Sequence, residues 1–326
     1  MKKALTTVIT LLLLCPIILP NANAVWNGNS APEIKREIPI FFDPYGPYCA
    51  SAFLYAPRIV FTVAHSIFRE NDLNEEPRTR RAAMWFGYPG TVQSIGNNRV
   101  FSEKIFISPN YKGRDFFRGG KNITRQNDFA VVVLQSPIEI DDKPVELLTP
   151  ELHEKYIASS EKISLMGYGA QDKGQMLNSG NCSKREPKIF ASEITQKTID
   201  ANPFNWTSTL NFRVGPSMPN LCDSDSGAGY IKLLPDKYIY LGAAGTGALN
   251  NPNCGSWEDA LNKETINGAD PVYQFLDLIR EAEKYVADHP YNVPVKKITI
   301  TCTKNKISKK IAGTNPTCPT GFKKIK

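Results

Sequence analysis

The chain has 326 residues, of which 41% are hydrophobic and 22% are charged. These values are ordinary for a globular protein and exclude a disordered or collagen-like chain. The formal charge of +7 is uneven, because nine lysines without any acid or arginine fall within residues 296–326. The rest of the chain is mildly acidic, so the basic end is expected to be a separate module.

Residues 1–24 have the features of a secretory signal peptide. Two lysines precede an apolar run over residues 8–20, and the segment ends in Asn-Ala-Asn-Ala at residues 21–24. A charged start, an apolar middle and a small-residue end are typical of a cleaved signal. The alternative, a membrane anchor, is less favoured because the run is shorter than the roughly 20 residues that span a bilayer. We expect cleavage after Ala24 and export to an extracellular, periplasmic or cell-surface location.

From residue 25 to about residue 269 the chain consists of short apolar runs separated by Gly, Pro, Asn and Asp clusters. The clearest runs, rich in β-branched and aromatic residues, cover residues 58–64, 131–134, 162–166 and 237–241. This pattern predicts an all-β sandwich or barrel. Strands do not alternate with amphipathic helices, which argues against a doubly wound α/β fold.

One helix is predicted over residues 270–288, near the end of this body. The spacing of three and four residues that defines one helix face is seen at Val272, Phe275, Leu276 and Ile279. Asp270-Pro271 is a suitable entry, and His289-Pro290 ends the segment. After Pro294 the composition changes to lysine, threonine and isoleucine, which indicates a boundary.

Removal of the signal leaves six cysteines: Cys49, Cys182, Cys222, Cys254, Cys302 and Cys318. An even number in an exported chain favours disulfides, although six cysteines allow 15 pairings. Zinc is the alternative, but no Cys-x-x-Cys occurs and the three histidines lie far apart in the sequence. We expect no metal and no other cofactor.

Three segments each contain one member of a Ser-His-Asp set. They are F-T-V-A-H-S around His65, N-D-F-A-V-V-V-L around Asp128 and C-D-S-D-S-G-A-G around Ser226. A serine hydroxyl becomes a good nucleophile when a histidine takes its proton, and a carboxylate fixes the histidine tautomer. Each residue alone has an ordinary structural interpretation. Together, in the order His, Asp, Ser, they predict a catalytic triad of the chymotrypsin arrangement.

These segments resemble the histidine, aspartate and serine motifs of the trypsin/chymotrypsin family of serine proteases (T-A-A-H-C, D-I-A-L-L and G-D-S-G-G-P). Further stretches that resemble the family, in the same order, are Y-C-A-S-A-F-L at 48–54, I-S-P-N-Y at 107–111, M-G-Y-G at 166–169, residues 242–247 and the helix beginning near Val272-Tyr273. The resemblance spans about residues 25–286.

The resemblance implies two six-stranded antiparallel β-barrels with a C-terminal helix, followed here by a small C-terminal β-hairpin module. It identifies the chain as a secreted bacterial serine endopeptidase that hydrolyses peptide bonds through an acyl-enzyme on Ser226. The expected organisation is a signal peptide at 1–24, a protease domain at 25–290 and a lysine-rich, disulfide-closed module at 295–326. Its substrates would be proteins or peptides.

The family pattern also implies two features beside the nucleophile. The new amino terminus at Val25 would form a buried ion pair with Asp225, and signal cleavage itself would create this terminus. The backbone N–H groups of Ser224 and Ser226 would form the oxyanion hole. Ser224 replaces a glycine of the family motif, and glycine tolerates backbone conformations that serine resists.

By the same resemblance, the primary specificity pocket would include Asn220 at its base and Gly245, Thr246 and Gly247 as its walls. Trypsin-like cleavage after Lys or Arg relies on an aspartate at the base. Because Asn220 is neutral, strong selectivity for Lys or Arg is not expected.

The resemblance further implies a disulfide between Cys222 and Cys254, and Cys302 is expected to pair with Cys318 in the tail. Ser66 replaces the second cysteine of the family's histidine-loop bridge. Cys49 and Cys182 remain, and their pairing stays open.

Residues 295–326 are similar to small lysine-rich C-terminal units of exported bacterial proteins. Their charge would favour anionic surfaces such as cell-wall polymers or lipid headgroups, and the alternative is a solvated, dispensable tail. Nucleic acid is not an expected partner, because Phe322 is the only aromatic residue in the tail and no nucleic-acid motif occurs.

The leading hypothesis is therefore an active endopeptidase. The alternative is a catalytically weak or inactive protease-fold binding protein at the cell surface, which the serine at position 224 suggests. A third hypothesis is an adhesin-like surface protein that acts through its tail.

Overall fold

The computed structural model describes residues 28–30, 34–42, 49–67, 84–86, 100–111, 127–169, 187–195, 210–214, 220–222, 224–249, 265–291, 298–305, 307–313 and 316–325. The chain divides into two compact units, Met1–Asp288 and His289–Lys326. Among the described helices, none has the length and apolar character needed to cross a membrane.

The first unit contains a closed antiparallel barrel with the strand order β2-β3-β4-β7-β6-β5. Its strands are β2 (Glu37–Phe42), β3 (Cys49–Ala56), β4 (Ile59–Thr62), β5 (Met84–Phe86), β6 (Val100–Ile107) and β7 (Ala130–Leu134). Every residue of β4 and β7 is buried. Alternate residues of a strand point to opposite faces, so these two strands have apolar contacts on both sides. Their continuous apolar sequences follow from this position.

Six further strands of the same unit form a second ring. They are β9 (Lys162–Gly167), β10 (Lys188–Thr195), β11 (Leu210–Val214), β12 (Gly229–Leu233), β13 (Tyr238–Leu249) and β14 (Thr265–Ala269). They pair in the order β10-β11-β14-β13-β12-β9, and β9 also pairs with β10, which closes the ring. The short strand β1 (Asn29–Ser30) adds to β10, and β8 (Val145–Leu147) pairs in parallel with β13. The predicted all-β, two-barrel architecture is therefore confirmed.

Helices are few in the described part of this unit. They are α2 (Ala64–Ile67), α3 (Pro150–Ala158), the 3₁₀ turn η4 (Val272–Phe275) and α6 (Leu276–Asp288). The predicted helix begins two residues later than expected, because Pro271 has an extended backbone and its first turn is 3₁₀. Helix α3 was not predicted, since only His153 and Tyr156 are buried on it and its apolar pattern is weak.

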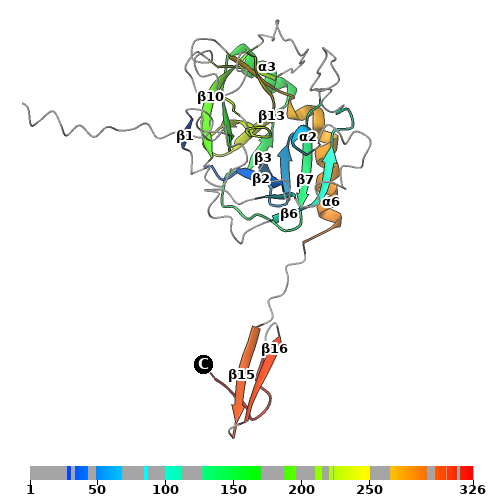
Figure 1. Cartoon of the computed structure of the whole chain (residues 1–326), viewed down its shortest axis with the longest axis vertical. Coiled ribbons are helices and arrows are strands. Elements are labelled where there is room, and N and C mark those ends of the chain that lie inside the picture. The colour runs from blue at the N-terminus through cyan, green and yellow to red at the C-terminus, as the bar shows by residue number, and fades with distance from the viewer. Residues whose placement is uncertain are drawn as a thin grey trace, which may run out of the picture. The chain divides into compact units, whose positions relative to one another are not determined.

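Aromatic side chains join the two barrels. Tyr240 of β13 packs against Phe53 of β3 and Phe61 of β4, with ring centroids 4.7 and 5.1 Å apart. Phe129, which immediately precedes β7, stacks on Phe275 of η4 at 4.5 Å, and α6 continues along β6 and β7 (Figure 1). The segments that carry the predicted triad thus extend from a single continuous core.

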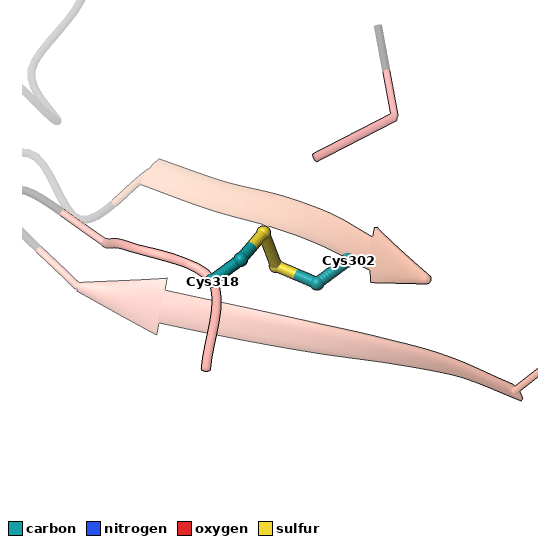
Figure 2. The surroundings of a disulfide bond; sticks show 2 residues. All are labelled: Cys302 and Cys318. Atoms are coloured by element: carbon teal, nitrogen blue, oxygen red, sulfur yellow. A yellow bond between two sulfur atoms is a disulfide. The ribbon is translucent and has the colours of Figure 1, made fainter. Parts of the chain in front are cut away.

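The second unit is a three-stranded antiparallel sheet with the order β16-β15-β17. Its strands are β15 (Ile298–Lys304), β16 (Ile307–Gly313) and β17 (Lys323–Lys324). A disulfide joins Cys302 of β15 to Cys318, as Figure 2 shows. Cys302 and Ile300 are buried, so they form a minimal core beneath the bridged segment. The expected hairpin is present, and β17 is added to it.

Candidate active site

His65 lies at the point where the buried strand β4 gives way to the short helix α2. Its Nδ1 is 2.5 Å from Oδ2 of Asp128, and its Nε2 is 2.9 Å from Oγ of Ser226. Its backbone N–H donates to the other oxygen of Asp128 at 2.9 Å. The structure therefore joins His65 in one line of hydrogen bonds to two side chains that lie 63 and 161 positions away in the sequence.

The hydrogen bonds of Asp128 determine which nitrogen of His65 carries the proton. An ionised carboxylate only accepts hydrogen bonds, so Nδ1 of the histidine donates to it. In the neutral imidazole, Nε2 is then the acceptor and receives the hydroxyl proton of Ser226. Both His65 and Asp128 are buried, which shields this polarised chain from competing water.

The nucleophile loop makes a tight turn around Gly227. The Gly227 N–H donates to the Ala244 carbonyl at 2.9 Å, and the Ala228 N–H donates to the Asp225 carbonyl at 2.9 Å. Gly227 has a φ of +90°, and a methyl group on it would lie 2.1 Å from the Ser51 carbonyl oxygen. The glycine after the serine is thus required both by its backbone conformation and by the close approach of β3.

Ser51 of β3 holds this loop from the first barrel, and sequence reasoning did not find it. Its N–H donates to the Ser226 carbonyl at 2.9 Å, and its Oγ donates to the Ser224 carbonyl at 3.0 Å. The same Oγ accepts from the Tyr168 N–H at 2.8 Å. The side chain is fully buried and its donor and acceptor are both used. The only signal in the sequence is a polar residue inside an otherwise apolar strand.

Ser224 adopts the left-handed conformation that glycine occupies without cost, with a φ of +75°. Among the described residues, its buried Oγ has no hydrogen-bond partner. In the same described part of the chain, the backbone N–H groups of Ser224 and Ser226 donate to no other group. Within the described ranges the two predicted oxyanion donors are therefore unengaged, and the loop carries backbone strain at the first of them.

Replacing Ser224 with glycine is expected to stabilise the protein by about 1–4 kcal/mol. A left-handed non-glycine residue costs roughly 1–2 kcal/mol, and the unpartnered buried hydroxyl costs about 1–3 kcal/mol. The larger freedom of glycine in the unfolded chain offsets about 0.5–1 kcal/mol. Urea unfolding would measure the change, with Ser224→Ala as a control that loses the hydroxyl but keeps the strained Cβ. A glycine variant less stable than wild type would contradict this account.

Asp225 is buried beneath the loop, with 1% of its surface exposed. Its carboxylate accepts from the Gly169 N–H at 2.6 Å and from the Cys222 N–H at 2.8 Å. A methyl group on Gly169 would lie 2.2 Å from this carboxylate, so the M-G-Y-G turn needs its final glycine. Val25, the predicted ion-pair partner, lies outside the described residues.

A second acid, Glu37 of β2, is buried nearby. Its Oε2 accepts from the N–H of Gly229 at 3.3 Å. Burial raises the pKa of Glu37 well above its usual range, and the charge of Asp225 adds to this effect. Burial therefore favours the neutral form of Glu37, a residue to which sequence reasoning assigned no role.

The residues predicted to line the pocket occupy two different environments. Asn220 is buried, and its Oδ1 accepts from the Leu221 N–H and from Nδ2 of Asn267, each at 2.8 Å. A methyl group on Gly245 would lie 3.2 Å from Oδ2 of Asp128, so this glycine borders the triad. The backbones of Thr246 and Gly247 belong to β13, where Thr246 pairs with Gly268 of β14.

The remaining cysteines are described in part. Cys222 is disulfide-bonded, and its predicted partner Cys254 lies outside the described residues. Cys49 belongs to β3, whereas Cys182 also lies outside the described residues. Within the described ranges, no group of three or more His, Cys, Asp or Glu side chains is arranged to hold a metal ion.

Two closed antiparallel barrels with a hydrogen-bonded Asp-His-Ser line at their junction define a chymotrypsin-like serine protease fold. The Trypsin family model matches residues 25–244, and the chain belongs to that family. The matched segment ends within β13, while the second barrel continues to β14. No curated protein matches the chain. Membership of this family assigns the chain a serine-protease type of function with protein or peptide substrates.

Proposed function

We propose that the protein is an active serine endopeptidase with Ser226 as nucleophile, His65 as general base and acid, and Asp128 as the group that orients His65. The observation that carries this proposal is the unbroken hydrogen-bond line from Asp128 through His65 to Ser226, at 2.5 and 2.9 Å. All three residues are present, and the tautomer required for catalysis follows from the contacts of Asp128.

In the proposed reaction, Nε2 of His65 takes the hydroxyl proton while Oγ of Ser226 attacks the peptide carbonyl carbon. The N–H groups of Ser224 and Ser226 receive the negative oxygen, and such a donor contributes about 3 kcal/mol to transition-state stabilisation. The imidazolium then protonates the leaving amine and the acyl-enzyme forms. His65 next deprotonates a water molecule, whose oxygen attacks the ester. Finally the proton returns to Oγ as the carboxylic acid is released.

The enzyme is proposed to lack a strong preference for cleavage after lysine or arginine. Asn220 carries no charge, and its amide oxygen is already engaged by Leu221 and Asn267. A substrate lysine or arginine would therefore find no carboxylate at this position. Profiling cleavage on a peptide library would measure the preference, and exclusive cleavage after Lys or Arg would contradict the assignment of Asn220 to the pocket base.

Export and amino-terminal processing complete the proposal. Signal cleavage after Ala24 would leave residues 25–290 as the protease domain, with the Val25 ammonium paired to Asp225. The burial of the Asp225 carboxylate supports this pairing, because a buried carboxylate gains stability from a cationic partner. Amino-terminal sequencing of the secreted protein would test it, since any start other than Val25 removes the pairing.

The module at residues 295–326 is proposed to hold the enzyme to an anionic polymer at the cell surface. Its exposed side chains include Lys304, Lys309, Lys310, Lys323 and Lys324, and none of its residues is acidic. Deletion of residues 295–326 would release the protein from cells if the module binds such a polymer. Unchanged cell association would identify the tail as dispensable.

The test of the catalytic proposal is labelling with a serine-directed fluorophosphonate probe. Wild type is expected to label, and Ser226→Ala is expected not to label. Ser66→Ala provides a matched control, because Ser66 is also a buried serine next to the histidine but is not in the proposed line. Labelling of both wild type and Ser226→Ala would contradict the role of Ser226.

The second candidate function is that of a weakly active or inactive protease-fold binding protein. The left-handed Ser224, whose hydroxyl has no hydrogen-bond partner in the part of the chain that the structure describes, favours this candidate. Strain at an oxyanion donor opposes formation of a competent site. Absence of labelling in folded wild-type protein would select this candidate.

A further inference from the structure

Asp270 contacts the segment that carries the triad aspartate, through the backbone of that segment. It follows strand β14 and precedes Pro271, which caps the turn η4. Its Oδ2 accepts the backbone N–H of Asp128 at 3.1 Å, and the N–H of Asn127 also donates to its carboxyl group. A side chain from the end of the second barrel thus holds the backbone that presents the triad aspartate.

The backbone held by Asp270 needs a partner at this point. Asn127 has a φ of +58°, in the left-handed region, where a non-glycine residue is strained. Its carbonyl accepts from the Phe129 N–H at 2.9 Å, which forms a narrow turn immediately before β7. The two hydrogen bonds to Asp270 stabilise this turn and therefore the position of Asp128 relative to His65.

We propose that Asp270 is a positioning residue for the triad, which orients Asp128 through its backbone and whose negative charge strengthens His65 as a base. This inference rests on the proposed catalytic function and adds a fourth, acidic residue that contacts Asp128. The contacts support both parts of the role. The hydrogen bonds fix the backbone position of Asp128. The two neighbouring carboxylates together place more negative charge near the His65 imidazole than Asp128 would alone.

The ionisation of Asp270 falls in the range where histidines titrate. Burial raises the pKa of Asp270 to about 6, and the charge of Asp128 adds to the increase, whereas the two backbone hydrogen bonds oppose it. Asp128 is the ionisable group whose charge acts on Asp270 among the described residues. The neighbour of Asp270 from strand β13 is Gly242, which has no ionisable side chain. It packs so closely that a methyl group added to it would lie 2.4 Å from the Asp270 carbonyl oxygen. Above about pH 6, the charge of Asp270 therefore favours a protonated His65.

The test compares wild type with Asp270→Asn, which keeps the shape of the side chain but removes its charge. The variant is expected to lose about tenfold in kcat with KM unchanged, because Asp270 is proposed to act through the backbone of Asp128. The acid limb of its kcat/KM profile is expected to move to lower pH, since His65 has lost a nearby negative charge. Asp142→Asn is the control, because Asp142 also accepts a backbone N–H, that of Lys143 at 2.7 Å. This variant is expected to change neither kcat nor the acid limb of the profile.

A titration of His65 by NMR separates this inference from the proposed function, because it needs no turnover. The midpoint of His65 is expected to fall by roughly half a pH unit or more in Asp270→Asn. Asp270→Glu, which keeps the charge, is expected to retain the wild-type midpoint. In wild type, whose fold no substitution disturbs, the His65 signal should show a second inflection near pH 6 as Asp270 ionises.

The role of Asp270 and the proposed catalytic function can fail separately. A His65 midpoint that is the same in wild type and Asp270→Asn, or a wild-type curve without the second inflection, would overturn the inference. A shifted midpoint in a protein that the fluorophosphonate probe does not label would leave the role of Asp270 intact and remove the catalytic function instead.

Discussion

Asp128→Asn is expected to lower kcat by about 10⁴-fold, because the change reverses the tautomer of His65. Both oxygens of Asp128 are acceptors: one receives the His65 backbone N–H and the other receives Nδ1–H. An asparagine has a single acceptor oxygen. If that oxygen keeps the backbone N–H, the amide NH₂ faces Nδ1, which must then be unprotonated. The remaining proton moves to Nε2, where it blocks acceptance of the Ser226 hydroxyl proton.

Steady-state hydrolysis of a peptide substrate would measure this loss, together with the rate of fluorophosphonate labelling. The matched control is again Asp142→Asn, whose carboxylate accepts from the Lys143 N–H at 2.7 Å and from the Tyr238 hydroxyl at 2.8 Å but is not in the proposed triad. Its kcat is expected to remain within about twofold of wild type. A kcat for Asp128→Asn within tenfold of wild type would show that Asp128 does not set the tautomer.

Gly227→Ala is expected to destabilise the protein by about 3–5 kcal/mol and to abolish labelling of Ser226. The added methyl group would lie 2.1 Å from the Ser51 carbonyl oxygen and 2.2 Å from Oγ1 of Thr62. Neither atom can move freely: the Ser51 carbonyl accepts from Thr62 at 3.0 Å, and both residues are buried in adjoining strands. The φ of +90° adds strain that no rearrangement of side chains relieves.

Denaturant unfolding followed by tryptophan fluorescence would measure the loss of stability. Gly313→Ala is the control, because the nearest atom to its added methyl group, Cβ of Pro316, is at 3.8 Å, an ordinary contact. This variant is expected to unfold like wild type. Equal stability of Gly227→Ala and wild type would mean that the nucleophile loop and β3 are not in the contact described.

Ser51 and Asp270 illustrate why part of the site could not be predicted. Ser51 bonds to a carbonyl 173 positions away in the chain, and Asp270 bonds to an N–H 142 positions away. Nothing in the residues that flank either one encodes such a partner. Both act on the backbone of a predicted triad segment, so their roles exist only when the two barrels meet.

The sequence by itself determined the features that depend on local pattern. Short apolar runs between turn residues predicted an all-β sandwich or barrel, and the family resemblance implied two barrels. The spacing from Val272 to Ile279 predicted the helix, and lysine content separated the tail. The identities and order of His65, Asp128 and Ser226 indicated the triad, because its chemistry demands those residue types. Only the tertiary structure decided the hydrogen-bond line between them, the left-handed conformation of Ser224 and the position of Gly245 against Asp128. These arise from contacts between distant segments, which local propensities do not specify.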